Sequence, residues 1–372
     1  MQATKKASQY RPDLAVVRRA PKVLLHEHLD GGVRPKTVIE FARKARYDGL
    51  PTQDETELAE WFHAGAARGS LPLYLEGFRH TIAVMQTPES LERVAYEFVE
   101  DMASDGVVYA EVRFAPHFHT ATGLGLDAVM RAVINGLRAG ERAFDVGIGL
   151  IVCAMRNQSA DLSFKLAELA VAWRDQGCVG FDLAGEEDGN PAKEHLRAFE
   201  FVKRANHSIT IHAGESFGPE SIWQALQYCG AHRIGHGTRL VEDFAIYDGK
   251  VIKVGQIAQY VLDHRIPIEV CLSSNVHTGA CKSLESHPFR FYLDRGFRVT
   301  LNTDNRLMSH TTMSDEFVIA VQHFGCALSD LEKIAINGMK SAFVHYDERV
   351  RTIFERIKPG YAKLREELGL TL

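Results

Sequence analysis

The chain has 372 residues, of which 45% are hydrophobic and 24% are charged, the composition of an ordinary globular protein. Its formal net charge of −5 and pI near 6.4 exclude the basic surface that nucleic-acid binding requires. The longest apolar stretch, Val146 to Met155, is too short to span a bilayer. Six scattered cysteines without a C-x-x-C pair indicate reduced thiols, so we expect a cytoplasmic protein with neither membrane nor nucleic-acid partners.

Short apolar runs alternate with longer amphipathic stretches along the whole chain. Eight runs have the length and β-branched content of strands: Val23–His28, Val107–Phe114, Val146–Ala154, Cys178–Leu183, Ser208–His212, His232–His236, Pro267–Ser273 and Phe297–Thr303. Between them, apolar residues from Leu91 to Met102 follow the spacing of one helical face, with Thr87 as cap and Pro88 in the first helical position. Similar helical patterns cover Leu162–Arg174, Glu194–Ala205 and Ser329–Met339.

Strands that alternate with helices favour parallel βα units. Eight of them predict an α/β fold of the (β/α)8 barrel type, with a doubly wound sheet as the alternative. We expect residues 1–372 to form a single domain, in which about residues 29–106 form a helical insertion after the first strand. Active sites of such barrels lie at the carboxyl ends of the strands. Polar residues that end strands are therefore the candidates for chemistry.

The first such end is His26-Glu27-His28, where residues two apart point to the same face of a strand. The fifth predicted strand ends in His212, with Glu215 three residues later. The sixth ends in His236, and the eighth ends before the pair Asp304-Asn305. Three imidazoles and a carboxylate, with a position left for water, make a catalytic zinc site. The predicted ligands of one Zn²⁺ are His26, His28, His212 and Asp304.

Two further residues at these strand ends fit proton transfer. A catalytic zinc lowers the pKa of its water to about 7, and His236 would sit beside that water as a base or an electrostatic orienter. Glu215 is placed to donate a proton to the substrate as general acid. The segment Phe181–Gly185 has no lysine to bridge two metals, which favours one ion. Each histidine alone could be structural; their joint position at separate strand ends favours a site.

The segments LLHEHLDGG, GVVYAEVRFAP, VGFDLAGEE, TIHAGES, RIGHG and TLNTDN resemble, in this order, those of the adenosine deaminase family of the amidohydrolase superfamily. The resemblance runs from about residue 22 to beyond residue 310. It implies a (β/α)8 barrel with one zinc ion. It also implies hydrolytic deamination of adenosine and 2′-deoxyadenosine to inosine and deoxyinosine with release of ammonia, a reaction of purine salvage. The expected partner is therefore a small purine nucleoside.

The resemblance also assigns roles to individual residues. The four predicted ligands match the family's metal ligands, with Asp304 also among its catalytic groups and His28 also at the substrate. Glu215 matches the acid that protonates purine N1, and His236 the residue that orients and deprotonates the attacking water. Asp30 matches a contact to the ribose hydroxyls and Gly185 a backbone N–H at N3. A lid over the base, or ordinary packing of a helix, is the expectation for Leu71, Tyr74, Leu75 and Phe78.

One position departs from the family pattern. Asn305 stands where members commonly carry a second aspartate, at purine N7. Because N7 is an acceptor, the Asn305 amide can donate to it with no pKa shift. The alternatives are a deaminase of another 6-aminopurine, such as adenine or a futalosine-type nucleoside, or a non-catalytic purine-binding protein on the same scaffold. Asp30 disfavours free adenine, because it supplies a group for a sugar hydroxyl.

Overall fold

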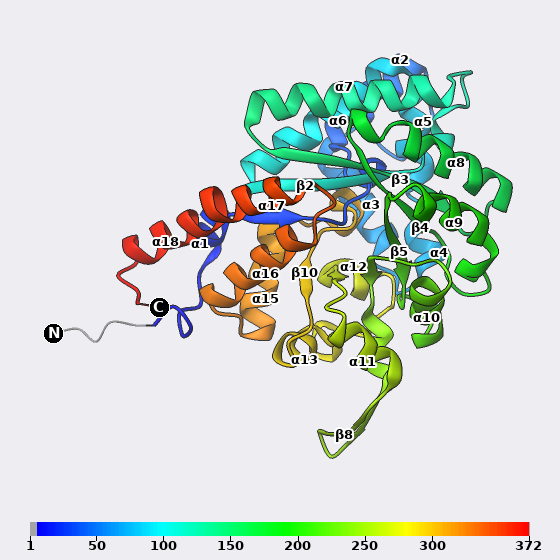
Figure 1. The fold of residues 1–372 in the computed structure, drawn as a ribbon. Coiled ribbons are helices and arrows are strands. Elements are labelled where there is room, and N and C mark those ends of the chain that lie inside the picture. The colour runs from blue at the N-terminus through cyan, green and yellow to red at the C-terminus, as the bar shows by residue number, and fades with distance from the viewer. Residues whose placement is uncertain (1–5, 372) are drawn as a thin grey trace.

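A ring of parallel strands surrounded by helices forms the body of the protein in this computed structural model, which describes residues 6–371 (Figure 1). The sheet order is β1-β2-β3-β4-β5-β6-β9-β10. The bounds of these strands are Lys22–Leu24, Val107–Phe114, Gly147–Met155, Cys178–Ala184, Ser208–Ala213, Arg233–His236, Ile268–Val270 and Val299–Leu301. The predicted (β/α)8 architecture is confirmed. The single domain stays a prediction, and its residues 1–5 and 372 lie outside the described residues.

The ring closes between the first and the last strand through the segment that follows β1. The backbone N–H of His28 donates to the carbonyl of Asp304 at 2.7 Å, and the N–H of Asp304 donates to the carbonyl of His26 at 2.9 Å. The predicted strand over Val23–His28 is therefore regular only to Leu24. Beyond it the chain forms isolated bridges to both neighbours, because the two histidines lie at the rim where the ladder ends.

Helices cover the outside of the ring and fill the long connection after β1. That connection contains a 3-10 turn at Leu29–Gly31 and helices α2 Pro35–Ala45, α3 Glu55–Ala66, α4 Leu71–Leu75, α5 Phe78–Val84 and α6 Pro88–Ser104. The predicted cap of α6 is confirmed, since the Thr87 hydroxyl accepts from the N–H of Ser90 at 3.2 Å. The other helices include α1 Leu14–Arg19, α7 Leu126–Phe144, α8 Ala160–Ala172, α9 Leu196–Arg204, α10 Pro219–Gln227, α11 Gln256–Asp263, α12 Leu272–His277, α13 Phe289–Asp294, α14 Arg306–Ser309, α15 Met313–Phe324, α16 Leu328–Ser341, α17 Tyr346–Thr352 and α18 Lys358–Glu367.

An antiparallel hairpin, β7 Phe244–Tyr247 and β8 Lys250–Val254, projects from the barrel and was not predicted (Figure 1). Its turn residues Asp248 and Gly249 both have positive φ, at 48° and 69°. An Asp-Gly pair between short apolar runs is a hairpin signal. The alternation of buried runs with helices does not reveal this hairpin, because most residues of its two strands are exposed.

The core lies inside the barrel and between its strands and the surrounding helices. Strand β3 shows why these sequences form strands here: residues Ile148 to Ala154 are all buried, on both faces of the sheet. No helix within residues 6–371 is long and apolar enough to cross a membrane.

Candidate active site

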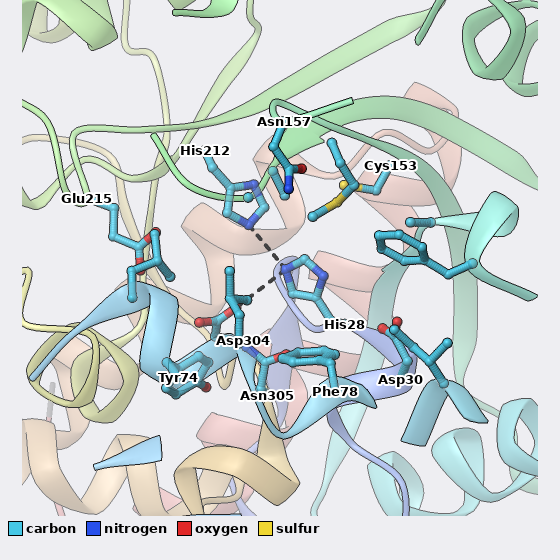
Figure 2. Close-up of a pocket in the computed structure, with 18 of the residues that line it drawn as sticks. His28, Asp30, Tyr74, Phe78, Cys153, Asn157, His212, Glu215, Asp304 and Asn305 are labelled. Atoms are coloured by element: carbon cyan, nitrogen blue, oxygen red, sulfur yellow. Dashed lines mark hydrogen bonds and ion pairs between the residues drawn. The ribbon is translucent and has the colours of Figure 1, made fainter. Parts of the chain in front are cut away.

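The predicted site residues meet at the carboxyl ends of the strands, around a cavity of about 340 Å³ (Figure 2). Of the predicted residues only His26 does not line the cavity, because it is buried behind the others. The predicted residues that line it are His28, Asp30, Leu71, Tyr74, Leu75, Phe78, Gly185, His212, Glu215, His236, Asp304 and Asn305. Figure 2 shows His28 between His212 and Asp304, with Glu215 and Asp30 on opposite sides of this cluster.

The histidines form a compact group of nitrogen donors. One ring nitrogen from each of His26, His212 and His236 and one oxygen of Asp304 lie within 4.8 Å of one another. His28 joins them, with Nε2 at 3.1 Å from Nε2 of His212 and 3.5 Å from Oδ1 of Asp304. The buried Nε2 of His26 has no hydrogen-bond partner among the described residues. Facing imidazole nitrogens beside a carboxylate fit a divalent cation, since this donor set is the one zinc prefers.

Buried carboxylates orient two of these rings from behind. Nδ1 of His26 lies 2.8 Å from Oε2 of Glu269, and Nδ1 of His212 lies 3.1 Å from Oδ2 of Asp182. Each contact directs the opposite nitrogen toward the cluster, an arrangement that commonly fixes metal-binding histidines. The guanidinium of Arg113 donates to both carboxylates, at 2.7 Å to Asp182 and 2.9 Å to Glu269. Sequence reasoning missed this trio, although each is a charged residue within an apolar strand.

His236 differs from the other imidazoles in its partners. Its Nδ1 lies 2.9 Å from the Asn275 amide nitrogen, which donates to it, and its Nε2 lies 3.6 Å from Oε2 of Glu215. Burial holds the pKa of His236 well below its ordinary value, so this ring is neutral and able to accept a proton. His236 and Asp304 both have left-handed backbone, with φ of 62° and 61°. Such strain in non-glycine residues is concentrated at functional sites.

Glu215 lies on a turn that another glutamate holds in place. Four successive backbone N–H groups, from Gly214 to Phe217, donate to the buried carboxylate of Glu187 at 2.6 to 3.0 Å. Burial raises the pKa of the Glu215 carboxyl well above its ordinary value, and the charges of Asp304 and Glu187 raise it further. A raised pKa lets the carboxyl keep its proton to higher pH, which is the state that a general acid requires. Glu187 was not predicted. Its one indication in the sequence is that the segment LAGEE ends in two acidic residues.

The opposite side of the cavity offers polar groups among apolar walls. Asp30 is buried, and burial raises its pKa to about 7. Gly185 has a φ of 95°, which favours glycine at this position. The buried Oδ1 of Asn305 has no hydrogen-bond partner among the described residues. A Cβ on Gly31 would lie 1.9 Å from that same oxygen, so Gly31 makes room for Asn305.

The predicted apolar residues of α4 and α5 do line the cavity. Tyr74 is fixed by a hydrogen bond of 2.8 Å between its hydroxyl and that of Ser309. The ring of Phe78 lies edge-on to His28, with 6.5 Å between the centroids. Cys153 and Asn157, both labelled in Figure 2, are among the lining residues that were not predicted. Apolar walls with a few converging polar groups are typical of a site for a small organic ligand.

A parallel barrel whose rim combines clustered imidazoles, a carboxylate and a buried acid is typical of the class of metal-dependent hydrolases. Residues 21–359 match the family model described as adenosine deaminase. Two similar proteins are adenosine deaminase 1 of Streptomyces coelicolor, 53% identical over 94% of this chain and 89% of its own length, and the adenosine deaminase of Mycobacterium marinum, 52% identical over 95% and 98%. Among solved structures, the adenine deaminase of Arthrobacter aurescens superposes with a TM-score of 0.83 at 25% identity, covering 93% of this chain and 99% of that one. The chain belongs to the adenosine deaminase family.

Proposed function

We propose that this protein is an adenosine deaminase that hydrolyses adenosine and 2′-deoxyadenosine to inosine and deoxyinosine, with release of ammonia. The observation that carries this proposal is the buried carboxyl of Glu215, 3.6 Å from the imidazole of His236 in an apolar cavity beside the histidine cluster. An acid and a base at this distance can serve one reacting carbon. Relatives named adenosine deaminase at 52–53% identity support the same substrate.

We propose a single Zn²⁺ held by His26, His28, His212 and Asp304. When bound, this ion would act as a Lewis acid and lower the pKa of water at the site. His236 belongs to the same cluster, but its Nδ1 accepts from Asn275 and its Nε2 faces Glu215. These two contacts favour a role for His236 at the attacking water rather than as a ligand.

The proposed chemistry adds water to C6 of the purine and expels the amino group as ammonia. Glu215 donates its proton to N1, where electron density accumulates as C6 becomes tetrahedral. His236 orients the attacking water and accepts its proton. Because both groups are buried, their hydrogen bonds act in a low-dielectric site, where such electrostatic stabilisation is strongest.

The remaining predicted contacts would orient the nucleoside. Asp30 accepts from a ribose hydroxyl, the N–H of Gly185 donates to N3, and the Asn305 side-chain amide donates to N7. The lid residues of α4 and Phe78 cover the base and exclude water. A buried carboxyl at the sugar end supports a nucleoside over free adenine, which offers no hydroxyl there.

The test is a substrate panel with purified, metal-analysed protein. We expect one zinc per chain and loss of the adenosine absorbance with adenosine and deoxyadenosine, with little turnover of adenine, AMP or futalosine-type compounds. Faster turnover of adenine would transfer the assignment to that base. Zinc-loaded protein that turns over no purine would support the non-catalytic binding alternative.

A single substitution tests the proposed general acid, Glu215. Glu215→Gln keeps the shape of the side chain and removes the proton donor, so we expect metal content to persist and turnover to be nearly lost. A rate like that of the unchanged protein would remove Glu215 from its role. The cytoplasmic location stays a prediction, best checked by fractionating cells that express the protein.

A further inference from the structure

A second cavity, of about 480 Å³, lies at the end of the barrel opposite the active site. Its lining includes Ser208, Arg233, Pro267 and Arg298, which begin or directly precede β5, β6, β9 and β10. These are the amino ends of the strands, whereas the catalytic residues lie at the carboxyl ends. The final wall consists of residues 340–344, which run from the last two residues of α16 into the loop before α17, together with Arg349 of α17.

The lining of this cavity is strongly basic. It includes five lysine or arginine residues and two histidines, and no aspartate or glutamate. Only Arg233 is neutralised, by contacts of 2.6 Å to Glu111 and 2.5 Å to Glu269. Within residues 6–371 no carboxylate oxygen lies within 4.0 Å of the other four cationic groups, which are Arg265, Arg298, Lys340 and Arg349.

The arginines of this cavity lie close enough to repel one another. Burial lowers the pKa of Arg298, and the charges of Arg265 and Arg349 lower it further. The Nε atoms of Arg298 and Arg349 are buried and have no hydrogen-bond partner in the described part of the chain. Buried donors are normally satisfied, and an unsatisfied one is costly. Unpaired like charges with free donors are the electrostatic signature of an anion site.

We propose that this cavity is a binding site for a small anion bearing two or more phosphate groups. Guanidinium groups recognise phosphate through paired, charge-assisted hydrogen bonds, and four unpaired cations match the charge of such a ligand. The volume lies in the range of small-molecule pockets. The chain as a whole carries a net charge of −5, so a local basic pocket favours a small ligand over a nucleic acid, which needs an extended basic surface.

The experiment is calorimetric titration of the full-length protein with inorganic pyrophosphate, repeated with ADP. Comparable affinities would identify the phosphates alone as the ligand chemistry, and tighter binding of ADP would identify a nucleotide; both support the site. Arg298→Gln and Arg349→Gln should each weaken the affinity about 10- to 100-fold, the loss expected for a hydrogen bond between charged groups. Arg351→Gln is the matched control, since Arg351 is also on α17 but lines a different cavity.

Thermal melting provides a second measurement that does not depend on enzymatic activity. Pyrophosphate should raise the Tm of the unchanged protein and of Arg351→Gln, because a ligand that binds only the folded state stabilises it. In phosphate-free buffer Arg298→Gln should melt no lower than the unchanged protein, since it removes one repelling charge. If Arg298→Gln does not fold, Arg349→Gln and Arg265→Gln carry the same comparison.

Three results would overturn the proposal. The first is a Kd for pyrophosphate and ADP above about 1 mM at low salt. The second is binding that Arg298→Gln and Arg349→Gln leave unchanged, or that Arg351→Gln weakens equally. The third is tighter, arginine-dependent binding of a single-stranded oligonucleotide. None of these outcomes depends on whether the protein deaminates adenosine.

Discussion

The substitution Glu187→Gln should impair turnover although Glu187 does not line the active-site cavity. Its Oε1 accepts from the N–H of Gly214 at 2.6 Å, and its Oε2 accepts from the three N–H groups of residues 215–217 at 2.8 to 3.0 Å. A glutamine amide can keep its oxygen toward these three donors only by turning its NH₂ toward Gly214, so that one buried N–H loses its acceptor.

The size of the effect follows from these bonds. A buried donor without a partner costs about 1–3 kcal/mol. The other three bonds also lose their charge assistance, which roughly doubles the strength of a hydrogen bond. The turn can relieve this cost by moving, and Glu215 moves with it. If about 1.4–2.7 kcal/mol of this cost appears in the barrier, kcat falls about 10- to 100-fold. KM should change less than kcat, because the proposed contacts to the ribose, N3 and N7 come from other segments.

The assay compares kcat and KM for adenosine among the unchanged protein, Glu187→Gln and Glu186→Gln. Glu186 is the exposed neighbour of Glu187 and serves as the matched control for loss of one charge. Hydrogen exchange of the peptide that contains residues 213–218 should be faster only in Glu187→Gln. If Glu187 acts through Glu215, adding Glu187→Gln to Glu215→Gln should lower the residual rate no further.

The positioning role of Glu187 is refuted if Glu187→Gln folds and retains the kcat of the unchanged protein. It is also refuted if hydrogen exchange of the turn is unaltered, or if the double variant loses the full product of both single effects. The last outcome would mean that Glu187 stabilises the barrel in general rather than positioning the acid.

Three further predictions concern groups around the site. Arg113→Lys should weaken metal affinity by about 10- to 100-fold, because one ammonium cannot bridge both carboxylates. Competition with a chelator measures this affinity, and an unchanged value would show that the Arg113 bridge does not influence metal binding. Gly31→Ala should reduce kcat/KM for adenosine with metal content intact, because its Cβ displaces the Asn305 amide; steady-state kinetics with metal analysis checks this, and normal kinetics would contradict it. Glu316 is buried, and burial raises its pKa from 4.5 to about 7, so the folded state holds a proton that the unfolded state releases as pH rises through this window. The contribution of Glu316 to the free energy of unfolding should therefore fall by about 3 kcal/mol between about pH 4.5 and pH 7. Urea unfolding curves should show this as a smaller loss of stability over this window in Glu316→Gln than in the unchanged protein.

Residues at strand ends could be predicted because the barrel places all of them at one rim. His26, His28, His212 and Asp304 were recognisable for this reason, each as a polar residue that closes an apolar run. The barrel itself followed from the alternation of the same runs. The regular length of three strands was overestimated: β1 ends at Leu24, with isolated bridges only at Glu27 and His28, and β9 and β10 end at Val270 and Leu301.

The supporting contacts could not be predicted, because they join residues far apart in the sequence. Arg113 lies 69 residues from Asp182 and 156 residues from Glu269, and no local pattern pairs a buried charge with its partner. Glu187 was hidden for a related reason, since its partners are backbone amides of a turn and carry no side-chain signature. The basic cavity likewise assembles from residues far apart in the sequence, at the beginnings of four strands and in the segment from the end of α16 to α17.

The double contact of Arg113 has a consequence for altering this enzyme. Strands β2, β4 and β9 supply one arginine and two carboxylates, and these three charges set the orientation of two imidazoles on two other chain segments. The two histidines, which we propose as metal ligands, therefore cannot be exchanged one at a time, because a different side chain at either position would face a buried carboxylate that now pairs with an imidazole. A changed metal preference would require substitution of Arg113, Asp182 and Glu269 together with the histidines. These three charged residues do not line the substrate cavity.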